Sequence, residues 1–220
     1  MNEFEDEIKE DILDIARRLT IKGLIRGSQG SISVRLNKNR IIITPPKCPI
    51  GYIKLDDLVI LDGHGQLPNG RPFSSTDLPL HKLAYQIEPE TVAVIIAHPP
   101  ITTAFSISNR IIQPGVYPEF DFLFPKGVPN IPYVPDLPYE QSDIIQEALT
   151  HFETLILSGR STLSVGRSLS MAWLNIEHLE ACMEVYFYSE CLNARKSLTE
   201  KQVNLLRERR NIKKSLNGPR

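Results

Sequence analysis

The fold of this chain is decided by two segments, Ser75-Thr76-Asp77-Leu78-Pro79-Leu80-His81 and Val94-Ile95-Ile96-Ala97-His98-Pro99-Pro100. In the first, an acidic residue ends a hydroxyl-rich turn and a helical pattern follows it. In the second, an apolar run that ends in a histidine predicts a buried strand that carries one imidazole to a cleft. A carboxylate and an imidazole are only part of a metal site, because catalytic zinc normally has three protein ligands and one open position.

Size and composition indicate one domain with a sizeable core, since the chain has 220 residues and is 41% hydrophobic. The formal net charge of −1 gives no general attraction to nucleic acid or to a membrane surface. No apolar run approaches the ~20 residues of a membrane span, and the acidic start does not fit a secretory signal. Cys48, Cys182 and Cys191 cannot all pair within one chain, which favours a reducing compartment and a cytoplasmic protein.

Basic residues are concentrated in the tail, residues 196–220, which includes Arg207, Arg209, Arg210, Lys213 and Lys214. A basic tail could contact RNA or an acidic partner. We favour a solvated helix that frays into a disordered end, because no aromatic residues interleave with the charges as stacking on bases requires. Nucleic acid is therefore not an expected partner.

The rest of the pattern alternates between the helical and strand periods. Helices are expected at 8–19, 80–86, 102–108, 143–151 and 169–195, and strands at 31–35, 40–44, 58–62, 92–97, 154–158 and 164–166. The first two strands should form a hairpin across residues 36–39. The Pro-rich segment 113–138 should be a long irregular loop. A sheet surrounded by helices predicts an α/β or α+β layered domain.

Five motifs carry a family resemblance. They are residues 23–35 (GLIRGSQGSISVR), 42–45 (IITP), 55–63 (LDDLVILDG), 75–85 (STDLPLHKLAY) and 97–100 (AHPP). Their order and spacing are similar to the class II aldolase and adducin head-domain family, from about Asp11 to about Tyr188. That family includes sugar phosphate aldolases and epimerases.

The resemblance implies a fold and a chemistry. The fold is a three-layer α/β/α sandwich around a mainly antiparallel sheet, formed here by residues 1–195, and the assembly is a homotetramer with active sites between subunits. A divalent metal, usually zinc on three histidines, binds a ketose phosphate or the enediolate left after carbon–carbon cleavage and stabilises its negative charge. A small phosphorylated sugar is then the expected ligand.

The resemblance also places a phosphate cradle. Its residues would be Ser28, Gly30, Ser31, Thr44, Ser75 and Thr76. Short side chains and exposed N–H groups suit this role, because a dianion is best held by many convergent donors. Lys47 stands where the second loop of the family has glycine, and its ammonium could contact the phosphate or fill the pocket.

Two residues match the family's proton-transfer groups. Asp77 follows the paired hydroxyls, as the family's base or extra metal ligand does; taken alone, it could equally be the N-cap of the next helix, with Pro79 in the first turn. Tyr117 falls at the position of a tyrosine that donates a proton in the fuculose-type enzymes. A lone tyrosine in a Pro-rich loop is more often a surface aromatic.

The metal site is where this chain departs from the family. Of the three histidine positions, His98 occupies one, Ile96 stands on another and Arg160 on the third. An apolar side chain cannot bind a metal and a guanidinium repels one, so zinc is doubtful here. His151 is the least improbable substitute ligand. Alternatively, Arg160 binds an anion, an enolate oxygen or Asp77 itself.

Three kinds of function remain open. The chain could be a lyase or isomerase of a phosphorylated sugar, with Asp77 as base, His98 as ligand or polariser and Tyr117 as acid. It could be a non-catalytic relative that serves as an oligomeric scaffold. It could also bind a phosphorylated or carboxylated metabolite through the cradle and Arg160.

Overall fold

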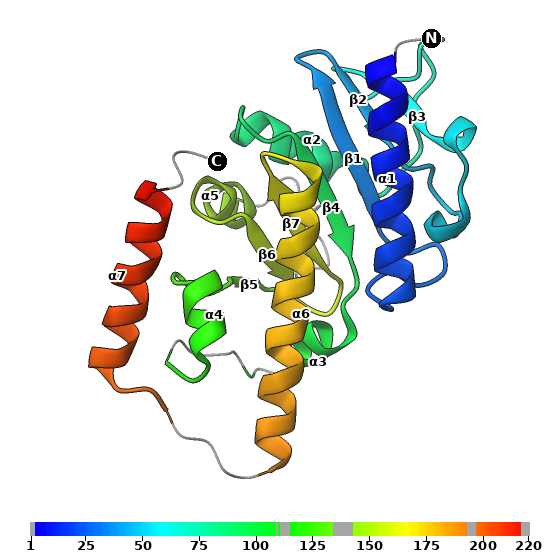
Figure 1. Cartoon of the computed structure of the whole chain (residues 1–220). Helices are drawn as coiled ribbons and strands as arrows, with labels where there is room; N and C mark the ends of the chain where they lie inside the picture. Colours follow the sequence, from blue (N-terminus) through cyan, green and yellow to red (C-terminus); the bar gives the residue numbers. More distant parts are fainter. Residues whose placement is uncertain (1–2, 109, 111–114, 134–142, 193–196, 217–220) are drawn as a thin grey trace.

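The computed structural model describes residues 3–108, 110, 115–133, 143–192 and 197–216. Within them a seven-stranded sheet has the order β3-β2-β1-β4-β7-β6-β5 (Figure 1). The strands are β1 (Ser31–Asn37), β2 (Arg40–Ile43), β3 (Val59–Asp62), β4 (Ala93–Ala97), β5 (Asn130–Ile131), β6 (Thr154–Leu157) and β7 (Ser161–Gly166). Only the β5–β6 pair is parallel. The predicted hairpin is confirmed as β1–β2.

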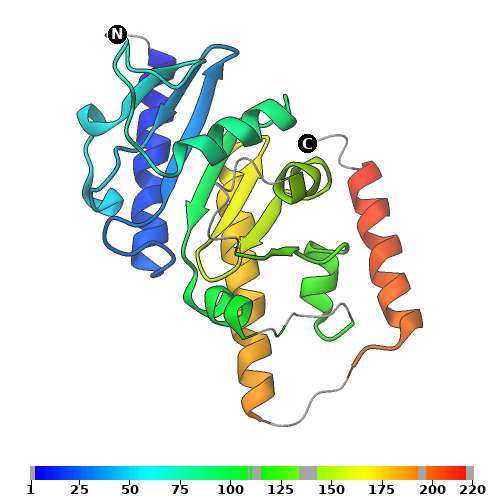
Figure 2. The ribbon, with the colours of Figure 1, turned by 180° about the vertical axis from the view of Figure 1, so that it is seen from behind.

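Helices cover both faces of this sheet. They are α1 (Glu3–Ile21), α2 (Leu78–Ile87), α3 (Pro100–Ile107), α4 (Pro118–Leu123), α5 (Asp143–His151), α6 (Leu169–Cys191) and α7 (Glu200–Leu216), with short 3-10 turns at Ile50–Tyr52 and Leu55–Asp57. The helices α1 and α6 lie in front of the sheet in Figure 1, and α2 and α5 lie in front of it in Figure 2, from the opposite side. The predicted three-layer sandwich around a mainly antiparallel sheet is confirmed.

The strand period assigns the core to the two faces. Successive residues of β4 point to opposite sides of the sheet. Ile95 packs with the apolar residues of α1 and α6, whereas Ile96 packs with those of α2 and α5. All five residues of β4 are buried, which explains why the sequence shows a continuous apolar run rather than an alternation.

The segment 113–138 is more regular than predicted. It contains α4 and β5, while its residues 113–114 and 134–138 lie outside the described part of the chain, as does the predicted helix end at Arg195. Phe120 and Phe124 are one helical turn apart and pack against α6. The buried carboxylate of Asp121 accepts the main-chain N–H of Gly115 at 2.9 Å. The interpretation as an irregular loop was therefore wrong for residues 118–123.

The basic segment after residue 196 contains a helix that returns to the domain. Helix α7 packs against α4 (Figure 1). The Leu198 N–H donates to the Gly115 carbonyl at 2.6 Å, and Val203 lies beside the same glycine. The sequence predicted the solvated helix but not this contact; the boundary between a domain of residues 1–195 and a tail of residues 196–220 stays a prediction.

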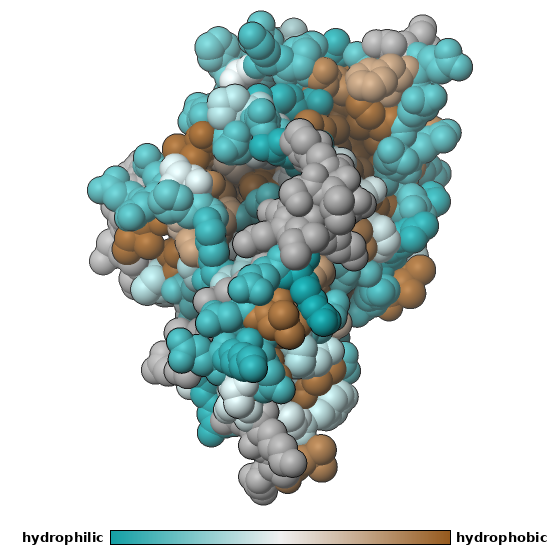
Figure 3. Space-filling model, turned by 60° about the vertical axis from the view of Figure 1, so that its left-hand side comes forward, coloured by the Kyte–Doolittle hydropathy of each residue, from teal (hydrophilic) through white to brown (hydrophobic). Residues whose placement is uncertain are grey.

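On the face shown in Figure 3, hydrophilic residues predominate among those that are coloured. On the face shown in Figure 3, hydrophobic residues form separate patches between hydrophilic ones. Within the described residues, every helix is too short or too polar to cross a bilayer.

Candidate functional site

Asp77 lies at the start of α2 with its carboxylate turned away from the helix. Asp77 is the N-cap residue of α2 and Pro79 lies in the first turn, as the sequence allowed, but the Asp77 side chain makes no capping bond. The Oδ2 atom instead accepts the Ser31 hydroxyl at 2.9 Å, and Oδ1 accepts an N–H of Arg160 at 3.2 Å. The main-chain carbonyl of Asp77 begins the helix by accepting the N–H groups of Leu80 and His81.

Arg160 reaches Asp77 from the tight turn between β6 and β7. This turn is closed by the Arg160 N–H, which donates to the Leu157 carbonyl at 2.9 Å. In the ion pair the Arg160 side chain is 29% exposed and that of Asp77 is 16% exposed. A partly buried charge pair of this kind is screened less by salt than an exposed one. Of the possibilities that the sequence left for Arg160, the structure shows the pairing with Asp77.

His98 follows β4 and completes a group that we call the Asp77 cluster, made of Asp77, Arg160, His98 and Ser31. Burial lowers the pKa of His98; the charge of Asp77 opposes this shift and that of Arg160 adds to it. Both charges therefore act on the imidazole. Within the described part of the chain its buried Nδ1 has no hydrogen-bond partner, so a neutral imidazole with an unused nitrogen lies beside a charge pair.

The residues of the Asp77 cluster do not fit a three-histidine zinc site. Ile96 is 1% exposed and packs in the apolar core. Arg160, which the resemblance puts at another ligand position, brings a positive charge beside Asp77. No group of three His, Cys, Asp or Glu side chains suited to a metal occurs among the residues that the structure describes. His151 does not replace the missing ligands, because it precedes β6 whereas Arg160 follows it, at the other end of the strand.

The predicted phosphate cradle divides into buried and exposed parts. Thr44 and Ser31 are buried, and their hydroxyls contact the Ile32 N–H and the Asp77 carboxylate. Gly30 lies against the main chain of β4: a Cβ there would be 2.6 Å from the Ile96 carbonyl oxygen.

The remaining cradle residues are more accessible. Ser28 and Thr76 are exposed, and the partly exposed Ser75 accepts the Asp77 N–H at 3.3 Å. Because residues 28–31 and 75–77 meet through the bond between Ser31 and Asp77, both turns border one site.

Lys47 adopts the backbone conformation that glycine favours. Its φ is +59°, and no other non-glycine residue among those described has a positive φ. A lysine in the left-handed region costs roughly 1 kcal/mol. The loop after β2 therefore has a left-handed residue at the position where the resemblance places a glycine.

Tyr117 lies in a different region. It precedes α4 and packs on an aromatic cluster that includes Phe105 and Phe120. Burial, followed by the proximity of Cys182 and Glu119, raises its pKa. Its described contacts join it to α6 and not to Asp77, so within one chain the structure does not bring this predicted acid to the cluster.

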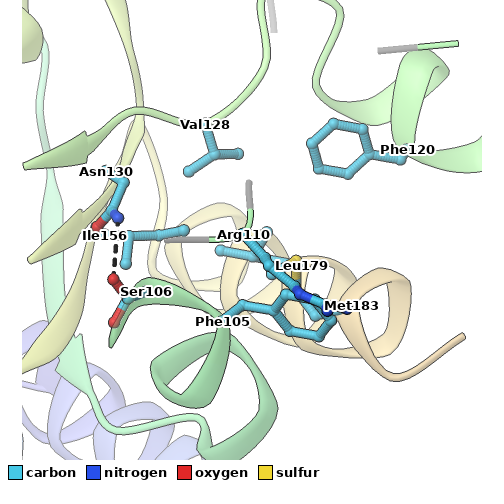
Figure 4. Close-up of a pocket in the computed structure, with 9 residues that line it drawn as sticks. All are labelled: Phe105, Ser106, Arg110, Phe120, Val128, Asn130, Ile156, Leu179 and Met183. Atoms are coloured by element: carbon cyan, nitrogen blue, oxygen red, sulfur yellow. Dashed lines mark hydrogen bonds between the residues drawn. The ribbon is translucent and has the colours of Figure 1, made fainter. Parts of the chain in front are cut away.

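A small cavity beside that aromatic region is not a sugar phosphate site. It is lined by Phe105, Ser106, Arg110, Phe120, Val128, Asn130, Ile156, Leu179 and Met183 (Figure 4). Its volume is about 20 Å³, room for about one water molecule. The Asn130 amide donates to the Ser106 carbonyl at its edge.

Sequence reasoning missed a buried polar group next to Asp77. No role is assigned to His81 from the sequence, yet both of its ring nitrogens form hydrogen bonds, to Ser31 at 2.8 Å and Ser33 at 2.7 Å. Tyr85 contacts Ser33 at 2.8 Å. The signal was present in the spacing: Asp77, His81 and Tyr85 recur every four residues, and Ser31 and Ser33 alternate along a strand.

Comparisons with known proteins identify the family of the chain. The family model described as Class II Aldolase and Adducin N-terminal domain matches residues 10–187. The chain is 27% identical to an L-fuculose phosphate aldolase of Methanococcus maripaludis, over 80% of this chain and 94% of that one. It is 28% identical to a 3-oxo-tetronate 4-phosphate decarboxylase of Haemophilus influenzae, over 91% and 96%.

Solved structures show the same fold. A putative aldolase/epimerase/decarboxylase from Escherichia coli superposes with a TM-score of 0.78 at 21% identity, covering 93% of this chain and all of the other. An aldolase II superfamily protein from Pseudomonas syringae gives 0.81 at 16% identity, covering 96% and 86%. With the family model spanning most of its length, the chain belongs to the class II aldolase and adducin N-terminal domain family.

Proposed function

We propose that this chain binds a small phosphorylated sugar or sugar acid and acts on the carbon next to its carbonyl group, as a lyase or isomerase. In this proposal a guanidinium stands in place of the family's metal. The observation that carries it is the ion pair of Asp77 and Arg160, which puts one base and one fixed cation beside His98. The names of two relatives, fuculose phosphate aldolase and 3-oxo-tetronate 4-phosphate decarboxylase, support a phosphorylated ligand.

The chemistry follows from the charges. When Asp77 removes a proton next to a carbonyl group, the oxygen of the resulting enediolate becomes negative. The planar guanidinium of Arg160 can donate two parallel hydrogen bonds to such an oxygen or to a carboxylate. The ligand must therefore displace Asp77 Oδ1 from Arg160, which frees that oxygen to accept the proton. His98 would polarise the carbonyl group through an imidazole N–H.

The other roles depend on assembly. Ser28, Gly30, Ser75 and Thr76 would hold the phosphate. Tyr117 would serve as acid in a homotetramer, where a neighbouring subunit brings it to the site. We place this enzyme in the cytoplasm, as the cysteine usage indicates, and assign no catalytic role to the segment after residue 196.

A second function, binding without catalysis, is favoured by one feature of the same ion pair. Asp77 and Arg160 neutralise each other, so the carboxylate that would act as base is in contact with a cation. A metabolite sensor needs only that an anion replaces Asp77 at Arg160.

Calorimetry in the presence of a chelator tests both functions. We expect a short ketose phosphate to bind, and Arg160→Gln to weaken binding roughly 10- to 100-fold, as for loss of a hydrogen bond to a charged group. Arg18→Gln is the control, because Arg18 forms an exposed ion pair with Asp14 on α1. Failure of ketose and sugar acid phosphates to bind would overturn both functions.

Product analysis by NMR then separates the two functions. Cleavage or isomerisation that persists with the chelator and is lost in Asp77→Asn supports the enzyme. Binding without conversion of any phosphorylated ketose or sugar acid supports the sensor.

A further inference from the structure

A continuous line of hydrogen bonds runs beneath α2 and ends at Asp77. The Tyr85 hydroxyl lies 2.8 Å from Ser33 Oγ, which lies 2.7 Å from His81 Nδ1. The His81 Nε2 atom lies 2.8 Å from Ser31 Oγ, which donates to Asp77 Oδ2 at 2.9 Å. Ser31, Ser33 and His81 are buried. Each step thus joins α2 to β1, and the line connects side chains 54 residues apart in sequence, from Ser31 to Tyr85.

Counting protons fixes the direction of this line. Ser31 has one hydroxyl proton, which it donates to the carboxylate, so Ser31 can only accept from His81 Nε2. A neutral imidazole that carries its proton on Nε2 must accept at Nδ1, and Ser33 supplies that proton. Ser33 then has none left and accepts the Tyr85 proton at 2.8 Å, a shorter contact than the 3.5 Å between the Tyr85 hydroxyl and the Val92 carbonyl oxygen. All four donors therefore point toward Asp77.

The other neutral tautomer conflicts with these contacts. With the proton on Nδ1, the lone pair of Nε2 would face a Ser31 oxygen whose only proton is already given to Asp77, at 2.8 Å. Protonation of both nitrogens is disfavoured as well, since burial lowers the pKa of His81 to about 4 against the opposing effect of Asp77. His81 is then a neutral donor toward Asp77 at neutral pH.

We infer that Ser31 and His81 are positioning residues for Asp77, holding Oδ2 through a directed line of hydrogen bonds while Oδ1 remains exchangeable between Arg160 and a ligand. The catalytic consequence rests on the proposed function, but the hydrogen-bond direction does not. The two carboxylate oxygens have different partners: Oδ2 faces a buried neutral group and Oδ1 faces a partly exposed cation. A ligand that takes Arg160 would leave the carboxylate anchored. This role also removes the Ser31 hydroxyl from the set of phosphate donors.

Nitrogen-15 NMR of the histidine rings tests the direction without any substrate. His81 is assigned by the signal missing in His81→Gln, and we expect a neutral ring protonated on Nε2. Asp77→Ala should shift the ring toward a mixture of tautomers, because the Ser31 hydroxyl then has no carboxylate to donate to and can donate to His81 Nε2 instead. Arg160→Gln is the matched control: it removes the other partner of Asp77 but keeps the carboxylate, so the tautomer should stay. A ring protonated on Nδ1, a charged ring, or an unchanged spectrum in Asp77→Ala would overturn the inference.

A pair of substitutions at His81 tests the positioning role once turnover is measured. Glutamine places its amide N–H near Nε2 and can still donate to Ser31, whereas asparagine reaches only the Nδ1 position near Ser33. We expect His81→Asn to lower kcat about tenfold with KM changed less than about twofold, and His81→Gln to retain more of kcat. Equal losses in both folded variants would reduce His81 to a packing residue. Absence of turnover in the wild type would count against the proposed enzyme and leave the tautomer result standing.

Discussion

Two parts of one sheet face differ in chemistry. Under α2, β1 presents Ser31 and Ser33 to Asp77 and His81, and every one of these side chains forms a polar contact. Along β4 and β7 the same face is apolar, with Ile96 and neighbouring residues in the core. The resemblance places the base on the first part and two metal ligands on or beside the second. Arg160 joins the two parts through its ion pair with Asp77.

This difference shows that the position of Asp77 does not depend on a metal ion. A base held only by a metal would lose its position with the ion. Here Asp77 is held by neutral groups on its own side of the sheet, and a guanidinium supplies the positive charge from the other. The comparison predicts two kinds of effect. Substitutions at Ile96 and Arg160 should change which ligand or metal the site binds. Substitutions along β1 should change the stability of the fold and the position of the Asp77 carboxylate.

The largest effect is expected from restoring the metal ligands. Ile96→His combined with Arg160→His would place two imidazoles beside His98. We expect about one Zn²⁺ per protomer with micromolar or tighter affinity, which corresponds to about 8 kcal/mol. Plasma mass spectrometry after dialysis against Zn²⁺, followed by calorimetry, measures this gain.

The single variant Arg160→His is the control, because it offers only two of the three imidazoles. Wild-type protein should retain no ion after the same dialysis. If the folded double variant gains no zinc, Ile96 or Arg160 does not occupy a ligand position, and the contrast between the two parts of the sheet loses its basis.

The second largest effect concerns Gly30, where β1 meets β4. Gly30→Ala would put a Cβ 2.6 Å from the Ile96 carbonyl oxygen, at a φ of +82°. We expect a loss of about 3 kcal/mol in the free energy of unfolding, since rigid backbone cannot yield as a side chain does. Gly27→Ala is a matched control: its φ is +57° but the added Cβ has no atom within 4 Å. Urea unfolding should give it a loss of only about 1 kcal/mol. Equal losses would mean that the close approach to β4 is not the cause.

The third prediction concerns the pH dependence of stability. Burial lowers the pKa of His81 from 6.5 to about 4, so between these values the unfolded chain binds more protons than the folded one. Stability should therefore stay constant above about pH 6.5 and fall as the pH drops toward 4, by on the order of 3 kcal/mol. Urea unfolding at a series of pH values measures the slope. His98, whose pKa is also lowered, contributes in the same direction.

Substitutions separate the two histidines. His81→Gln should remove most of the slope, whereas His151→Gln, at an exposed residue, should not. If the pH dependence of stability remains in His81→Gln and disappears in His98→Gln, His98 and not His81 is its main source.

The sequence alone predicts the layers well and the site in part. The apolar run before His98 and the hairpin across residues 36–39 have strong local signals. Arg160 was linked to Asp77 because its motif position was known from the resemblance. The spacing places Asp77, His81 and Tyr85 on one face of α2, but the register between α2 and β1 is set by tertiary packing, so the partners of His81 could not be predicted. For the same reason α4 was missed: Phe120 and Phe124 form one short helical turn among prolines, and α6 supplies the surface that stabilises it.

The smallest effect is expected at Lys47, in the loop that borders the β1 side. Lys47→Asn should stabilise the fold by about 0.5 kcal/mol, because asparagine tolerates the left-handed region better than lysine does. Lys47→Gly relieves the same strain but increases the conformational entropy of the unfolded chain, which offsets most of the gain. Urea unfolding should rank asparagine above glycine, and glycine close to the wild type.

The same variants show whether Lys47 is there for its charge. If its ammonium contacts the ligand's phosphate, Lys47→Asn and Lys47→Gly should both weaken binding several-fold in low salt, and the loss should shrink as salt is raised. Lys47→Arg keeps the charge and a similar strain, so it should retain most of the affinity. Full affinity in the asparagine variant together with higher stability would contradict a ligand role. Lys47 would then be a residue that the loop tolerates in place of glycine. Of the two loop residues Thr44 and Lys47, only Thr44 would remain a candidate for the site.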